Sequence, residues 1–228
     1  MLKFDEASHT YTNIETNSIY KSVTTLLGEY KTPFDSETHA ERISKREGVS
    51  KEFILDMWAA ETKKATDKGT KIHKIMEDYV KDKLRKPGFD IFYDSYDDVV
   101  SNFISKFTSI KSEQLLYHHE YEIAGTSDLI FEHKDTFTVG DFKTNKKFRF
   151  KSDFNDYFKD PISHLSYCEF NSYALQLSLY GYMNELISGK KCSNIVIFYL
   201  EGGKWIPQHV NFLRSDVINI LNHYKYNK

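Results

Sequence analysis

The sequence predicts a mixed α/β (α+β) protein in which helices flank a central β-sheet of mixed strand direction. Two observations carry this prediction. Residues 36–112 are dominated by apolar side chains at helical spacing, whereas residues 113–228 combine β-favouring runs with two further helical stretches and form the expected core. Because 228 residues suit one domain better than two, we expect a single domain over 1–228, with residues 1–35 as an N-terminal hairpin extension.

The N-terminal hairpin is predicted from two short β-favouring runs, residues 10–12 and 19–23, with a polar stretch between them. After it, from residue 36 to about residue 83, apolar residues recur at helical offsets. Gly69 is expected to divide this stretch into two helices, because glycine weakens a helix and Thr70 suits the N-cap of a second one.

A further amphipathic helix is predicted between Tyr96 and Phe107. Pro87 and Gly88 end the preceding helix, after which apolar residues resume at helical spacing. The helical segment over 36–112 is therefore expected to lead directly into the strand-rich centre of the chain.

Three strands are predicted at that centre, over residues 114–123, 127–132 and 136–142. These runs are rich in Leu, Tyr, Ile, Phe, Thr and Val, and Gly125 and residues 133–135 supply the turn signals. Short connections of this kind join antiparallel neighbours, so we expect a three-stranded antiparallel meander.

The C-terminal part begins with residues 143–161, which are polar, basic and aromatic without a clear period and are predicted to form a loop or lid. A long helix is expected over residues 163–188, with Gly189 as its stop signal. Two strands joined across Gly202 and Gly203, and then a final helix, are predicted over residues 194–200, 205–212 and 216–226.

The composition is that of a globular protein, with 40% hydrophobic and 28% charged residues and a net charge of −2. No global positive field is present, so a nucleic-acid partner would need a local basic patch. We find no signal peptide and no apolar stretch long enough for a membrane helix, and we expect a cytoplasmic protein without membrane contact. Two cysteines, Cys168 and Cys192, are too few for a disulfide framework, an iron–sulfur cluster or a four-cysteine zinc site.

The side chains most suited to chemistry are Asp128, Asp141 and Lys143. Two neighbouring antiparallel strands can bring the carboxylates together, and the two-residue period of a strand places Asp141 and Lys143 on one face. Paired carboxylates bind Mg²⁺ or Mn²⁺ and leave coordination sites for a water and a phosphate oxygen, while a nearby ammonium can stabilise developing charge. The alternative is that Asp128 caps a turn and the other two form a surface ion pair.

Four segments in one order distinguish these interpretations: Gly69–Glu77, Gly125–Ile130, Asp141–Thr144 and Gln176–Tyr180. Together they resemble the PD-(D/E)XK nuclease superfamily, in the branch with the RecB nuclease domain and phage or mitochondrial exonucleases. The opening residues 9–12 and 22–25 also resemble the start of phage members. Ser127 replaces the proline of the family name, and the acidic position before the lysine is aspartate; RecB-like members tolerate both variants.

The resemblance implies a restriction-endonuclease-like core with a metal centre. Asp128 and Asp141 would bind one or two Mg²⁺ or Mn²⁺ ions, with the backbone carbonyl of Phe142 as a third ligand and no iron–sulfur cluster. His73 resembles the additional ligand of the RecB-like branch. Glu77, one helical turn later, would reach the pocket directly or through water, and a helix-surface pair of these two residues is the alternative.

The resemblance further implies that Lys143, Asp128, Asp141, Gln176 and Tyr180 carry the catalysis. Gln176 and Tyr180 lie four residues apart on one helical face, which in the family holds the lysine and contacts the DNA backbone; a simple core position is the alternative for Tyr180. The expected DNA-binding residues are Thr70, Thr144, Lys146, Lys147, Arg149, Gln176 and Tyr180. A solvated basic loop is the alternative for the cations that follow Thr144.

The implied activity is metal-dependent hydrolysis of DNA phosphodiesters, starting from an end as in phage recombination or DNA processing. A structure-specific or restriction-type endonuclease and a catalytically silent DNA-binding module are the alternatives. The expected partners are DNA ends or single-stranded regions and a recombination or single-strand annealing protein, in the cytoplasm of a bacterial or phage-infected cell. Strand polarity and oligomeric state stay open at this point.

Overall fold

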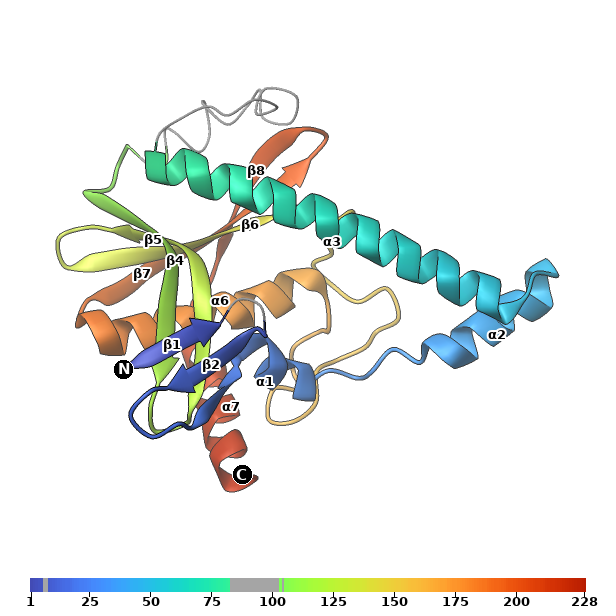
Figure 1. The fold of residues 1–228 in the computed structure, drawn as a ribbon, viewed down its shortest axis with the longest axis horizontal. Helices are drawn as coiled ribbons and strands as arrows, with labels where there is room; N and C mark the ends of the chain where they lie inside the picture. The colour runs from blue at the N-terminus through green and yellow to red at the C-terminus, as the bar shows by residue number, and fades with distance from the viewer. Residues whose placement is uncertain (6–7, 83–102, 104) are drawn as a thin grey trace.

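A computed structural model describes residues 1–228 except 6–7, 83–102 and 104, and the described strands form one sheet with five described helices around it (Figure 1). The strands are β1 (Leu2–Asp5), β2 (Thr10–Asn13), β3 (Ile19–Ser22), β4 (Ser109–His118), β5 (Ile123–Glu132), β6 (Thr136–Lys143), β7 (Lys191–Glu201) and β8 (Lys204–Val210). The helices are α1 (Val23–Glu29), α2 (Ser36–Glu47), α3 (Lys51–Asp82), α6 (Glu169–Ser188) and α7 (Arg214–Tyr226). The predicted mixed α/β class with a central mixed sheet is confirmed.

The sheet runs in the order β1-β2-β3-β5-β6-β7-β8, with β4 paired to β5 outside this path. The predicted order of a central antiparallel meander is confirmed, because β5 is antiparallel to both β4 and β6. The predicted turn at Gly125 is wrong, because β4 ends at His118 and Gly125 lies inside β5, paired with Leu116. The C-terminal hairpin of β7 and β8 is confirmed as well. The parallel pairs, β3 with β5 and β6 with β7, join segments distant in sequence and make the sheet mixed.

Strand β5 changes partner along one of its edges. β4 occupies the opposite edge over the whole length of β5, so β3 and β6 must share the remaining edge. β3 pairs there with residues 123–124, and β6 pairs with residues 129–132. Among the described strands, residues 125–128 therefore face a fork between two partners, and Asp128 lies at the end of this fork.

Two hydrophobic cores lie on opposite faces of the sheet. On one face α1, α6 and α7 pack against β-strand residues that include Ile130 and Val139. On the other face α3 contributes Ile72 and Met76, which pack with the Phe198 side of the sheet. The helix that carries His73 and the helix that carries Gln176 thus flank the sheet from its two sides.

The predicted break at Gly69 is wrong, because α3 is continuous from Lys51 to Asp82 and Thr70 is not an N-cap. A single glycine costs a helix about 1 kcal/mol relative to alanine, which neighbouring helix formers can offset. The real boundary is Gly48, whose left-handed φ of 69° ends α2. Gly69 instead faces the loop after β6, where an added Cβ would make an ordinary contact 3.4 Å from Oγ1 of Thr144.

Other boundaries differ more modestly. α6 begins at Glu169 and not at residue 163. β1 and α1 were not predicted, and the N-terminal hairpin of β2 and β3 is joined to the central sheet through β5. Most of the helix predicted over 96–107 falls outside the described residues. None of the helices in the described part of the chain combines the length and apolar character that a membrane span needs.

Candidate metal centre

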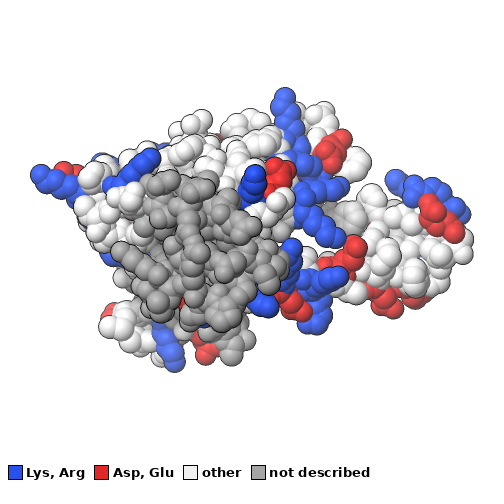
Figure 2. All heavy atoms as spheres, turned by 90° about the horizontal axis from the view of Figure 1, so that it is seen from above, with Lys and Arg blue, Asp and Glu red and all other residues white. Residues whose placement is uncertain are grey.

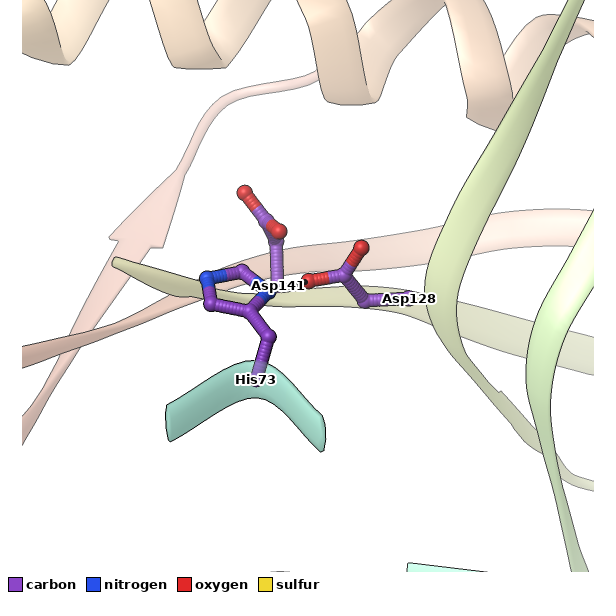
Figure 3. Close-up of side chains that lie close together, drawn as sticks. All are labelled: His73, Asp128 and Asp141. Carbon is purple, nitrogen blue, oxygen red and sulfur yellow. Dashed lines mark ion pairs between the residues drawn. The ribbon is translucent and has the colours of Figure 1, made fainter. Parts of the chain in front are cut away.

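Three side chains from three elements converge beside the fork: His73 of α3, Asp128 of β5 and Asp141 of β6. Each offers one ligand atom, and these atoms all lie within 4.8 Å of one another. In Figure 3, His73 extends from its helix toward the two carboxylates, which project from neighbouring strands. Nδ1 of His73 lies 3.0 Å from Oδ2 of Asp128.

Lys143 joins this group through Asp141. Its Nζ lies 2.5 Å from Oδ2 of Asp141, as expected for two residues on the same face of one strand. Val139, Asp141 and Lys143 are spaced two residues apart in β6 and therefore share one face of the strand. Because Val139 packs in the core beneath α6, the Asp141 carboxylate and the Lys143 ammonium lie on the α6 side of the sheet as well. The ion pair is largely buried, with side-chain exposures of 16% for Lys143 and 4% for Asp141.

The two carboxylates titrate in opposite directions. Burial and the charge of Asp128 raise the pKa of Asp141 above its ordinary range. Burial alone would also raise the pKa of Asp128, but the close contacts with His73 and Asp141 outweigh it and lower that pKa. Burial would lower the pKa of His73, yet the neighbouring Asp128 carboxylate raises it overall. The protonation states of His73, Asp128 and Asp141 therefore depend on one another, and a bound metal cation would displace protons from these groups.

The residues of the cluster fit a divalent metal ion. Oδ2 of Asp128 and Oδ2 of Asp141 are buried, and neither accepts a hydrogen bond of good geometry although cationic groups lie close by. Buried carboxylate oxygens without such partners are energetically costly unless a cation compensates them. Carboxylates are typical ligands of Mg²⁺ and Mn²⁺, and an imidazole is a common ligand of first-row transition-metal ions. This His–Asp–Asp group could hold such an ion.

Tyr173 of α6 is a neighbour of the centre that the sequence analysis missed. Nζ of Lys143 lies 4.6 Å from the centroid of its ring, and the Tyr173 hydroxyl donates to Oδ1 of Asn145 at 3.2 Å. The ring therefore adds a cation–π contact to the ion pair that the ammonium makes with Asp141. One signal was available, because Tyr173 precedes Gln176 by three residues and shares its helical face.

Gln176 and Tyr180 are joined as the spacing predicted: Nε2 of Gln176 donates to the Tyr180 hydroxyl at 3.1 Å. Tyr180 is buried, and burial strongly raises the pKa of its hydroxyl. Its ring lies against Gly125 so closely that a Cβ at that glycine would be 2.6 Å from Cε1 of the ring. Gly125 thus lets α6 approach β5 at the fork, three residues before Asp128.

Two further predicted metal ligands, Glu77 and the backbone carbonyl of Phe142, are not part of the group of three converging side chains. Oε2 of Glu77 lies 3.0 Å from Nζ of Lys74, and Glu77 is not among the three residues whose ligand atoms converge. The ring of Phe142 is buried in the core beneath α3, with its centroid 5.0 Å from that of Trp205. A metal-binding role for Glu77 or for the Phe142 carbonyl stays a prediction.

Apart from Gln176 and Tyr180, the predicted DNA-binding residues fall into two groups. Thr144 lies beside Gly69, while Thr70, Lys146 and Lys147 are exposed around the same junction of α3 with the loop after β6. Arg149 is engaged internally, since its guanidinium contacts Glu169 at 2.5 Å and Asp153 at 2.8 Å. These ion pairs attach the loop to the start of α6, a structural role that the sequence did not indicate.

Comparisons with known proteins place few constraints on this site. No family model matches the chain, and no curated protein matches its sequence. The crystal structure of SSO0001 is similar over 91% of this chain and 75% of that chain, with 12% identity and a TM-score of 0.40. A structure from Eubacterium rectale, named “Putative exonuclease”, is similar over 88% of this chain and 68% of that one, with 11% identity and a TM-score of 0.37. Neither likeness assigns a function.

Proposed function

We propose that this protein is a divalent-metal-dependent deoxyribonuclease that hydrolyses DNA phosphodiester bonds from an end. The observation that carries the proposal is the convergence of His73, Asp128 and Asp141 within 4.8 Å, with the Lys143 ammonium 2.5 Å from Asp141. Metal ligands with an adjacent buried cation suit phosphodiester hydrolysis, because the reaction develops negative charge on phosphate oxygens.

In the proposed reaction His73, Asp128 and Asp141 bind Mg²⁺ or Mn²⁺. The bound ion supplies Lewis-acid character and lowers the pKa of a water molecule. Asp141 and the Tyr173 ring hold the Lys143 ammonium from two sides, so that its charge can stabilise the phosphate without reorganisation. Tyr180 and Gln176 close the α6 side and exclude bulk water from the carboxylates.

The test is digestion of end-labelled linear DNA and closed circular DNA side by side, with Mg²⁺, with Mn²⁺ and with EDTA. We expect degradation of linear DNA with either metal, none with EDTA, and intact circles. Lys143→Ala should lower the rate by about 100-fold or more, because a buried charge at the reaction centre is lost. Lys134→Ala is the matched control, since this exposed lysine lies in the turn at the opposite end of the β5–β6 hairpin.

Each departure has a distinct meaning. Full activity of the Lys143→Ala variant, with wild-type activity in the control, would exclude the proposed centre. Nicking of closed circles would identify an endonuclease and exclude the dependence on ends. Failure of the folded wild type to cleave DNA with either metal would favour the silent DNA-binding module over the nuclease.

A further inference from the structure

A groove of about 670 Å³ lies beside the metal centre, between α3 and the loop after β6. Its α3 wall is a single helical stripe that includes Met57, Ala60, Lys64 and Lys68, spaced three or four residues apart. The opposite wall contains Thr144, Asn145 and Lys146, and Tyr173 of α6 and Lys143 also line it. The groove therefore shares the Lys143 side chain with the candidate metal centre.

We propose that this groove holds a single strand of DNA and leads its phosphodiester to the metal centre. The inference rests on the proposed nuclease function and adds to it the class of substrate. Lys64, Lys68 and Lys146 line the groove and offer cations to phosphates, with Glu61 as an acidic residue among them. Figure 2 shows Lys and Arg side chains gathered between the sheet-containing part of the molecule and the projecting end formed by α2 and the first half of α3, with acidic side chains among them.

The mixture of side chains favours a single strand over a duplex. Besides the lysines the groove presents apolar and aromatic surface, from Met57, Ala60 and Tyr173. A single strand exposes base faces that such surface can contact while its phosphates meet the cations. A duplex hides its base faces in the stack and would offer mainly phosphates, for which apolar lining has no use.

The size of the groove favours the same ligand. Its volume is within the range of about 300–1,000 Å³ that is typical of pockets for small ligands, which suits a short stretch of one strand. The whole chain carries a net charge of −2, so electrostatic attraction has to be local. The lysines of this groove supply that local attraction directly beside the reactive centre.

The test measures binding without cleavage. The full-length protein in EDTA is titrated into a fluorescently labelled single-stranded oligonucleotide, and separately into the corresponding duplex, at several salt concentrations. The groove variant combines Lys64→Ala with Lys68→Ala. The matched control combines Lys45→Ala with Lys63→Ala, because these lysines are 75% and 77% exposed on α2 and α3 and do not line the groove.

We expect the groove variant to bind the single strand about tenfold more weakly than the wild type, with the salt slope reduced by about 0.7 for each lost contact. The control should bind as the wild type does, and the duplex should bind more weakly than the single strand. Equal effects of both double variants, or tighter binding of the duplex, would overturn the inference. Because metal is absent, a protein that binds through the groove but never cleaves would contradict only the nuclease proposal.

Discussion

The two helices that border the candidate metal centre are held in very different ways. α6 has nine buried residues among its 20 and is enclosed by the sheet, α1 and α7. α3 is longer, with 32 residues, yet only Ile54, Ile72 and Met76 are buried among its described side chains at 51–78. Figure 1 shows its first half projecting beyond the sheet to meet α2.

Because of this difference, the packed elements position the metal centre and the exposed half of α3 forms part of the groove. The Asp141–Lys143 pair and the residues around it are set by strands and by α6, where dense packing fixes positions closely. His73 lies on α3 next to Ile72 and close to Met76, the two buried anchors of that helix on the sheet. The exposed half of α3, from Met57 to Lys68, is free of core packing and supplies one wall of the groove. A rigid centre is thereby combined with a solvent-accessible approach.

The largest expected effect is on stability and uses one methionine from each helix. Met183→Ala on α6 should lower the free energy of unfolding by about 2–5 kcal/mol, because a fully buried side chain leaves a cavity. Met57→Ala on α3 should change it by no more than about 0.5 kcal/mol, because that side chain is 45% exposed. Urea unfolding followed by circular dichroism measures both, and equal losses would show that the two helices are held alike.

A second pair of variants tests the approach of α6 to the fork. Gly125→Ala should destabilise the fold by about 1–3 kcal/mol, since its Cβ would lie 2.6 Å from the Tyr180 ring and force β5 or α6 to move. Gly28→Ala is the control, because no atom lies within 4 Å of the Cβ added there, and it should be neutral or stabilising by up to about 1 kcal/mol. A neutral Gly125→Ala variant would mean that the contact is loose.

These contrasts mark what the sequence could and could not predict. The central strands and the shared face of Asp141 and Lys143 follow from local alternation and turn residues, which act over a few positions. The 3.0 Å contact between His73 and Asp128 joins residues 55 positions apart, and geometry alone could not predict it without the family resemblance. Gly69 was misread because a glycine inside a continuous helix looks the same in sequence as one that ends a helix.

The rest depended on tertiary packing. Parallel pairing of β3 with β5 creates the fork at residues 125–128. Local sequence patterns do not predict this pairing, because the two strands are about a hundred residues apart. The groove stripe on α3 mixes apolar and cationic residues, and the sequence did not indicate a groove there because the opposite wall comes from the loop after β6. The ion pairs of Arg149 also depended on tertiary packing: the sequence suggested that this cation contacts phosphate, whereas in the fold it pairs with Glu169 and Asp153.

A smaller effect is expected where α6 contacts Lys143, the proposed catalytic lysine. Tyr173→Leu removes the ring beneath the ammonium and should lower the cleavage rate between about twofold and thirtyfold, the range of a cation–π contact. Tyr173→Phe keeps the ring, loses the bond to Asn145 and should retain most of the rate. If the two variants lose the same activity in single-turnover assays, the hydroxyl and not the ring is what matters.

Metal binding should depend on pH in a defined direction. The raised pKa of Asp141 means that the folded, metal-free protein keeps a proton that the unfolded chain has already lost. The metal-free fold is therefore expected to lose stability as the pH rises toward that raised pKa. A divalent ion must displace this proton, so its affinity and its stabilisation of the fold should both increase over the same rise in pH.

The most direct measurement of the proposed centre is a calorimetric titration of Mn²⁺ into the wild type, Asp141→Asn and the exposed control Asp135→Asn, at mildly acidic and mildly alkaline pH. We expect saturable binding that is tighter at alkaline pH, unchanged in the control, and weakened by about 100-fold or more in Asp141→Asn, because loss of a ligand should cost at least as much as loss of a group that orients one. Wild-type affinity in a folded Asp141→Asn variant would contradict a metal centre built on His73, Asp128 and Asp141.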